Sequence, residues 1–234
     1  MIPIPTRPDI TVKVLSMHHE EGPVKGVIIL LPGGTGMNLL PNGTTRSGNF
    51  LIRTRELFYN AGFDVVAVSN ASDQKVMAPS YRASAEHVAD LEAVVRYVKA
   101  HSDAPVWLVG TSRGTTSTAA AAVVFGNQLL AGVVLTSSVT TGQAGGSVLD
   151  QKLDQIKIPV LVVAHDNDTC KVTPPNAANT ILRNLTNAPV TKLIVETGGI
   201  SSGDPCEAFA HHGYNGIEAQ TVSDITNWMA APSQ

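Results

Sequence analysis

Short apolar runs alternate with longer amphipathic segments along this chain. The runs are rich in valine and isoleucine and do not alternate between apolar and polar positions, which is typical of parallel strands covered on both faces. They predict core strands at Gly26–Leu31, Asp64–Ser69, Pro105–Val109, Gly132–Thr136, Pro159–Ala164 and Thr191–Glu196. An earlier stretch, Thr11–Met17, does alternate, so we expect it to form an edge strand.

Segments with a helical period separate the predicted strands. Helices are expected at Arg46–Ala61, Tyr81–His101, Thr115–Phe125, Pro174–Leu185 and Ile217–Met229. Strands that alternate with helices predict βαβ units, and therefore a mostly parallel central sheet with helices on both faces. The chain shows no internal repeat, low-complexity tract or linker, so we expect residues 1–234 to form one α/β domain.

The composition excludes several classes of function. The chain has 234 residues, 43 % hydrophobic and 15 % charged, which is enough apolar sequence for a large buried core. The net charge is −3 and no Lys or Arg stripe occurs, so nucleic acid is not an expected partner. No apolar run approaches the roughly 18 residues of a membrane span. Residues 1–8 lack the features of a signal peptide, although a mature N-terminus left after cleavage is an alternative.

The strongest chemical signal is a Gly-x-Ser-x-Gly motif, Gly110 to Gly114, centred on Ser112. It directly follows a predicted strand and directly precedes an alanine-rich predicted helix. A sharp strand-to-helix turn lifts a serine hydroxyl clear of the sheet, and the two glycines leave room for the crowded backbone. The helix N-terminus also favours negative charge nearby. We therefore expect Ser112 to be a catalytic nucleophile.

A serine nucleophile needs a base, and the base needs an orienting acid. Two candidate acids, Asp166 and Asp168, follow the predicted strand that ends at Ala164, and Asp168 is favoured because the turn needs a few residues to bring a carboxylate round. The long loop after the last strand contains two candidate bases, His211 and His212. Adjacent imidazoles cannot both face the serine, and we favour His212.

Acyl transfer to an activated serine also needs an oxyanion hole. One donor is expected to be the backbone N–H of Arg113, the residue after the nucleophile. The other should come from the glycine-rich loop Pro32–Gly36, which follows an early strand. This loop lacks the Gly-Lys-Ser/Thr and Gly-x-Gly-x-x-Gly patterns of phosphate-binding loops.

From Gly26 to Met229 the chain resembles the α/β hydrolases. The family's acid often lies in a His-Gly-x-x-Asp pattern, and Asp168 takes the matching position after His165, with Asp166 in place of the glycine. His212-Gly213-Tyr214 matches the family's histidine followed by a small residue and an aromatic one. The family's His-Gly pair before the first oxyanion donor is Pro32-Gly33 here, which implies Gly34, or less favourably Thr35, as donor. The resemblance implies hydrolysis of an ester, amide or related acyl bond.

Many relatives carry a helical cap over the site, inserted before the acid strand. Ser137–Ile158, the corresponding segment, is too short for a cap domain, so we expect an open site shielded only by Met37–Asn49. Arg113 is expected to pair with Glu207 or Asp204. Its alternative role is recognition of an acidic group on the substrate.

The two cysteines, Cys170 and Cys206, follow the candidate acid and precede the candidate base. In this fold the acid loop and the histidine loop meet, so the sequence predicts a disulfide between them. Two free thiols are the alternative. A disulfide favours a periplasmic or secreted protein, and free thiols favour the cytoplasm.

Three functions remain open at this point: a serine hydrolase, an acyltransferase with the same triad, and a non-catalytic binding protein. The expected substrate is a small acyl compound. No spacing typical of a metal site occurs, and no cofactor is expected.

Overall fold

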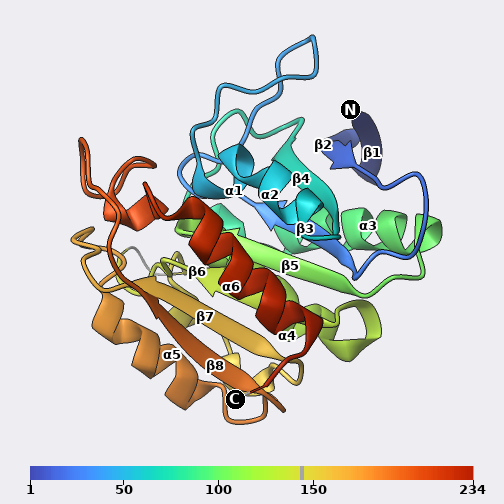
Figure 1. Cartoon of the computed structure of the whole chain (residues 1–234). Helices are drawn as coiled ribbons and strands as arrows, with labels where there is room; N and C mark the ends of the chain where they lie inside the picture. Colours follow the sequence, from blue (N-terminus) through green and yellow to red (C-terminus); the bar gives the residue numbers. More distant parts are fainter. Residues whose placement is uncertain (143–144, 234) are drawn as a thin grey trace.

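One eight-stranded sheet organises the computed structural model, which describes residues 1–142 and 145–233 (Figure 1). The strands are β1 (Ile2–Arg7), β2 (Ile10–Met17), β3 (Val27–Leu31), β4 (Asp64–Ala71), β5 (Val106–Thr111), β6 (Gly132–Thr136), β7 (Val160–His165) and β8 (Thr191–Glu196). Their order across the sheet is β1-β2-β4-β3-β5-β6-β7-β8. All pairs from β4 to β8 are parallel, as the apolar runs predicted.

The expectation that Thr11–Met17 forms an edge strand is wrong. β2 is not the edge strand, because β1 pairs with it in antiparallel register on its outer side. The alternation within Thr11–Met17 did not reveal β1, whose sequence contains Pro3 and Pro5. Proline lacks the N–H that a central strand must donate, and it is tolerated in a strand that has only one neighbour.

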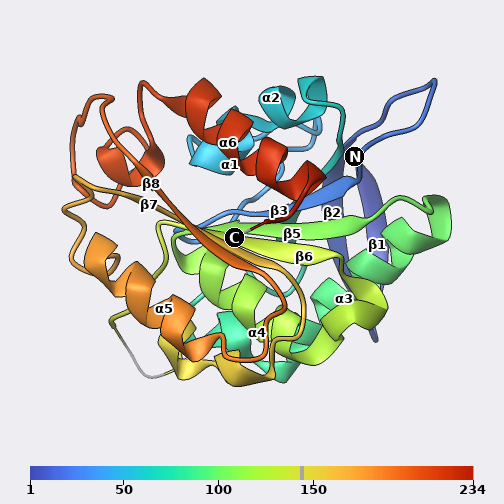
Figure 2. The ribbon, with the colours of Figure 1, turned by 60° about the horizontal axis from the view of Figure 1, so that its bottom comes forward.

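Helices cover both faces of the sheet. Their bounds are α1 (Phe50–Arg53), α2 (Arg55–Asn60), α3 (Ala85–His101), α4 (Arg113–Leu129), α5 (Ala178–Asn184) and α6 (Glu218–Ala230). Figure 2 shows α1, α2 and α6 on one face and α3, α4 and α5 on the other. Each layer buries its own apolar core against the sheet. None of the helices in the described ranges is long and apolar enough to cross a membrane.

Single-turn 3₁₀ helices complete the secondary structure: η1 (Ser80–Ala83), η2 (Val148–Asp150), η3 (Leu153–Gln155), η4 (Pro175–Ala177) and η5 (His211–Gly213). Three predicted helices are divided, and within the predicted Pro174–Leu185 helix η4 is followed directly by α5. Arg46–Ala61 contains α1 and α2, which meet at Thr54, and the predicted Tyr81–His101 helix contains η1 and α3, which meet at Ser84. The Ser84 hydroxyl accepts the backbone N–H of His87, so it starts a new helix there.

The strand order places a crevice at the centre of one sheet edge. The chain runs from β3 outward to β4 and then returns past β3 to form β5, so the loops after β3 and β5 diverge. Ligand sites of open α/β sheets lie at such switch points, outside the carboxyl ends of the strands. Between β6 and β7, the described residues form only the short turns η2 and η3, and no cap domain covers this edge.

Candidate active site

Ser112 lies at the switch point, between the end of β5 and the start of α4. It has a φ of +53° and a ψ of −128°, a conformation that a residue with a side chain rarely adopts. Its backbone N–H donates to the carbonyl of Thr136 on β6, 3.0 Å away, which holds the turn against the sheet. The hydroxyl is thereby raised over the carboxyl ends of the strands, as the Gly-x-Ser-x-Gly motif predicted.

Gly110 and Gly114, the two glycines of the motif, lie where backbone segments come too close together for a side chain. A Cβ at Gly110 would lie 2.5 Å from the carbonyl oxygen of Gly114, and a Cβ at Gly114 would lie 2.0 Å from that of Leu31. Both distances are far below contact, so α4 can cross over β3 and β5 only where these side chains are absent.

Asp168 is the carboxylate that turns into the site. It follows β7, and its side chain is 1 % exposed. One carboxylate oxygen, Oδ1, accepts the backbone N–H of Cys170 at 2.9 Å. The other, Oδ2, accepts the hydroxyl of Thr173 at 2.8 Å and lies 3.0 Å from Nδ1 of His212. The buried charge of Asp168 is therefore held by three hydrogen bonds.

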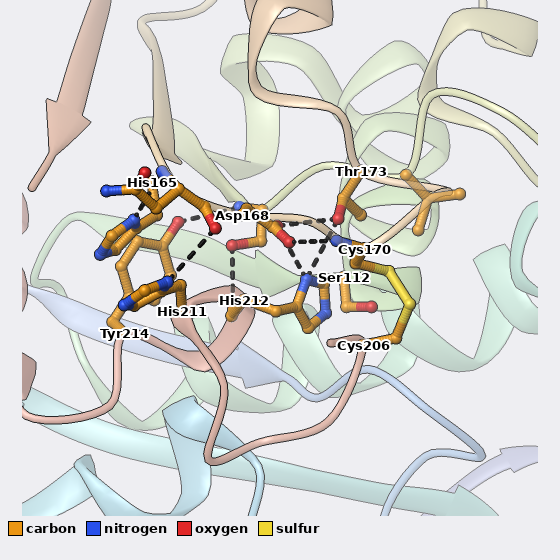
Figure 3. Close-up of polar contacts among 12 residues, drawn as sticks. Ser112, His165, Asp168, Cys170, Thr173, Cys206, His211, His212 and Tyr214 are labelled. Carbon is orange, nitrogen blue, oxygen red and sulfur yellow. Dashed lines mark hydrogen bonds and ion pairs between the residues drawn. A yellow bond between two sulfur atoms is a disulfide. The ribbon is translucent and has the colours of Figure 1, made fainter. Parts of the chain in front are cut away.

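His212 receives its orientation from two groups at the same nitrogen. Its Nδ1 lies 3.0 Å from Asp168 Oδ2 and 3.1 Å from Thr173 Oγ1. Because the Thr173 hydroxyl donates to Asp168, both oxygens accept from the imidazole, and these bonds assign the proton to Nδ1. The other ring nitrogen, Nε2, is left as an acceptor, and Figure 3 shows it facing Ser112. Both side chains line one cavity.

The other candidate acid and base point elsewhere. Asp166 is exposed and accepts a hydrogen bond from the Asn167 side chain. His211 stacks on His165 with ring centroids 4.6 Å apart, and its Nδ1 lies 3.3 Å from the Asn167 carbonyl. Burial lowers the pKa of His165, and its Nε2 donates to the carbonyl of Gly198. His165 and His211 thus brace the acid loop against the histidine loop and do not reach Ser112 (Figure 3).

Tyr214 anchors the histidine loop, a role that the sequence alone did not assign. Its buried hydroxyl donates to the Val163 carbonyl and accepts the Ser137 backbone N–H, both at 3.0 Å. The Ser137 hydroxyl in turn donates to the His212 carbonyl at 2.8 Å. Burial raises the pKa of Tyr214, so the phenol stays neutral. The aromatic residue of the His-Gly-Tyr pattern thus fixes the backbone of His212 to the ends of β6 and β7.

The disulfide predicted between Cys170 and Cys206 is present, and it joins the acid loop to the histidine loop (Figure 3). Within the described ranges, Asp168, Cys170 and His212 form the cluster closest to a metal-ligand set, with ligand atoms within 4.8 Å of one another. The Cys170 sulfur is bonded to Cys206 and His212 Nδ1 faces Asp168, so this cluster offers no thiolate to a metal.

The glycine-rich loop after β3 lies directly against the serine. A Cβ at Gly33 would lie 2.7 Å from the Ser112 Cβ, which shows how closely the two backbones approach. The backbone N–H groups of Gly34, Thr35 and Arg113 donate to no backbone carbonyl of the described residues. The predicted donors lie on either side of Ser112, with Gly34 and Thr35 on the loop after β3 and Arg113 at the start of α4.

A cavity of about 620 Å³ opens over Ser112 and His212. Ser47, Gly48 and Asn49, the end of the segment expected to shield the site, form part of its wall. Phe209, with 53 % of its surface exposed, lies at the same cavity.

Arg113 departs from its expected pairing. In the part of the chain that the structure describes it forms no ion pair, although Glu207 lines the same cavity. Asp204 instead caps its own turn by accepting the Cys206 N–H. The predicted salt bridge from Arg113 to Glu207 or Asp204 is therefore wrong, because both acidic side chains lie on an exposed part of the histidine loop.

Solved structures of hydrolases share this architecture at low sequence identity. An esterase from Pyrococcus furiosus matches with a TM-score of 0.69 and 13 % identity, over 97 % of this chain and 88 % of that chain. A dienelactone hydrolase from Anabaena variabilis matches with a TM-score of 0.66 and 12 % identity, over 97 % and 94 % of the two chains. A serine hydrolase without lid from Xanthomonas campestris matches with a TM-score of 0.59 and 15 % identity, over 97 % and 90 %.

No protein-family model matches the chain, and no curated protein matches its sequence. The structural matches extend over nearly the whole chain, and one of the matched proteins is itself described as lidless. The chain therefore has the α/β-hydrolase fold, in the form that carries no cap domain.

Proposed function

We propose that this protein is a serine hydrolase that cleaves an ester or a related acyl bond through an acyl-enzyme. One observation carries the proposal: His212 is bound at Nδ1 by buried Asp168 and turns Nε2 toward Ser112, inside a single cavity. This is the arrangement of nucleophile, base and orienting acid that activates a serine. The esterases and serine hydrolases among the structural matches support the reaction class.

The reaction follows from these positions. His212 takes the proton of the Ser112 hydroxyl while the serine oxygen attacks the carbonyl carbon of the substrate. The N–H groups of Gly34 and Arg113 bind the negative oxygen of the tetrahedral intermediate. His212 then gives the proton to the departing alcohol, and water repeats the sequence on the acyl-enzyme. Asp168 keeps the imidazole oriented and stabilises its charged form, as a triad carboxylate does.

A fluorophosphonate probe tests this proposal directly. The probe should add one phosphonyl group to the protein, and mass spectrometry of the digest should place it on the Ser112 peptide. Ser112→Ala should remain folded, take up no probe and lower kcat for a model ester by on the order of 10³-fold or more. Equal labelling of the folded Ser112→Ala variant contradicts the proposal. A panel of p-nitrophenyl esters, with amide and lactone controls, then defines the acyl group.

A further inference from the structure

Arg82 carries a buried positive charge without a carboxylate beside it in the part of the chain that the structure describes. The residue lies in η1, behind the glycine-rich loop, and is 2 % exposed. Within the described ranges no acidic side chain comes within ion-pair distance of it, and Nε has no hydrogen-bond partner. Burial and the like charge of Arg113 lower the pKa of Arg82 to about 9, which still leaves the guanidinium protonated at neutral pH. An unpaired buried cation is costly, so its position calls for an explanation.

The contacts of this guanidinium point to the loop beside the serine. Nη2 donates to the carbonyl oxygens of Gly33 and Gly34, at 3.3 and 3.2 Å. Nη1 donates to the Ser117 hydroxyl at 3.3 Å, and that hydroxyl lies 2.9 Å from Nε2 of His87. Burial and the Arg82 charge lower the pKa of His87 to about 3, so the ring is neutral and accepts from Ser117. Neutral acceptors thus fix the guanidinium in place without cancelling its charge.

The two carbonyls that Arg82 holds also fix the direction of the N–H groups in the same two peptide units. In a trans peptide the N–H points away from the C=O of the same unit, and the described residues contain no cis bond. Since Arg82 holds the carbonyls of Gly33 and Gly34, the N–H groups of Gly34 and Thr35 point away from it. Gly34 and Thr35 line the cavity, whereas Arg82 does not. Gly34 also has a φ of +58°, a left-handed conformation found where successive N–H groups converge on an anion.

We propose that Arg82 is a positioning residue of the oxyanion hole, which holds the Gly33 and Gly34 carbonyls so that the Gly34 and Thr35 N–H groups face the cavity. Its uncompensated charge polarises these two peptide units and stabilises the negative oxygen that forms during acyl transfer. This inference rests on the function proposed above. In this role, the counter-charge of the Arg82 guanidinium is the negative substrate oxygen, which forms only during the reaction.

The test compares Arg82→Gln and Arg82→Lys with the wild type in two assays. These are the rate at which a fluorophosphonate labels Ser112 and the steady-state turnover of a model ester. Arg82→Gln should lower the labelling rate and kcat by on the order of 100-fold, with KM changed less than threefold, since oxyanion binding acts on the transition state. Arg82→Lys should lose on the order of tenfold, because an ammonium keeps the charge but cannot span two carbonyls as a guanidinium does.

A stability control separates this role from structural support. Ile181→Val shortens a fully buried side chain on α5 and should lower Tm without changing either rate. If the wild type is not labelled on Ser112, the proposed function itself fails. If the wild type is labelled and a folded Arg82→Gln variant reacts within threefold of it, only the role of Arg82 is refuted.

A structure of the phosphonylated wild type tests the same inference without any variant. The oxygen of the adduct should accept from the Gly34 or Thr35 N–H and from the Arg113 N–H, with the Gly33 and Gly34 carbonyls still on Arg82. An adduct oxygen bound elsewhere, or carbonyls turned away from Arg82, overturns the proposal even if the Arg82 variants do not fold.

Discussion

Thr173 Oγ1 lies 3.1 Å from Nδ1 of His212, although 39 residues separate them in the chain. The same hydroxyl donates to Asp168 at 2.8 Å, so it stands at the junction between the proposed acid and base. Thr173 is itself buried, which leaves no solvent to replace its hydroxyl. Thr173 therefore orients the His212 imidazole together with Asp168, and a Ser-His-Asp pattern does not name this threonine.

Removing this hydroxyl should lower activity without abolishing it. Thr173→Val keeps the shape of the side chain and leaves Asp168 with one acceptor site unfilled. A hydrogen bond to a charged group contributes about 1.5–3 kcal/mol, so kcat/KM should fall by roughly 10- to 100-fold. Thr173→Ser, which keeps the hydroxyl, should recover most of the activity. Equal turnover by wild type and the valine variant, measured on one model ester, contradicts this role.

The two adjacent histidines should differ sharply in their contribution. His212→Ala removes the proposed base and should resemble Ser112→Ala, with a loss of on the order of 10³-fold or more in kcat. His211→Ala removes only a ring that stacks on His165 near the surface, so its effect should stay below about fivefold. Steady-state kinetics of both variants on one ester decide the matter, and the opposite ranking refutes the assignment of His212.

The disulfide should contribute to stability as well as to the position of the histidine loop. Cys170 and Cys206 are 36 residues apart, for which the chain-entropy model gives about 4 kcal/mol. A double Cys→Ala variant at these positions should therefore melt roughly 10 °C lower in calorimetry. Thiol titration of the denatured, unreduced wild type should find no free thiol. Two titratable thiols in protein made under oxidising conditions speak against the bond.

Glu196, at the end of β8, should make stability depend on pH. One of its carboxyl oxygens is buried without a partner, and burial together with the charge of Asp224 raises its pKa to about 7. Between the unfolded pKa of about 4.5 and pH 7 the folded state binds a proton that the unfolded chain does not, so this group's contribution to stability falls as pH rises. Glu196→Gln should raise Tm at pH 8 and leave it nearly unchanged at pH 4. An equal Tm for both proteins at pH 8 contradicts the raised pKa.

The sequence predicted those features that depend on neighbouring residues. Apolar runs marked the parallel strands, and the motif around Ser112 placed a tight turn between a strand and a helix because both signals are local. β1 escaped notice because Pro3 and Pro5 oppose a strand unless the position at the sheet edge is known. Whether Thr11–Met17 has one neighbour or two likewise depends on the whole sheet.

Residues that act through distant contacts could not be predicted in this way. Arg82 is 49 residues from the Gly33 carbonyl that it holds, and no local pattern marks an arginine for burial without a carboxylate. Thr173 bears no motif, and its role exists only once the acid loop meets the histidine loop. Tyr214 did carry a signal, the aromatic residue after His-Gly, but only its contacts with Val163 and Ser137 explain it.

The first part of the histidine loop is fastened at two points: the Gly198 carbonyl accepts from His165, and Cys206 forms the disulfide. Every residue from 199 to 205 between these fastenings is exposed, and the segment leads directly into the cavity wall at Cys206. The backbone of this segment is held by hydrogen bonds from the Ile200 N–H to Asn215 and from the Ser202 N–H to Phe209, and a Cβ at Gly199 would lie 2.5 Å from the Asn215 carbonyl oxygen. Outward-pointing side chains at the other exposed positions can therefore change while the contacts of His212 with Asp168 and Thr173 stay in place. The segment thus offers positions at which the surface leading to the cavity can be altered without touching the residues that orient His212.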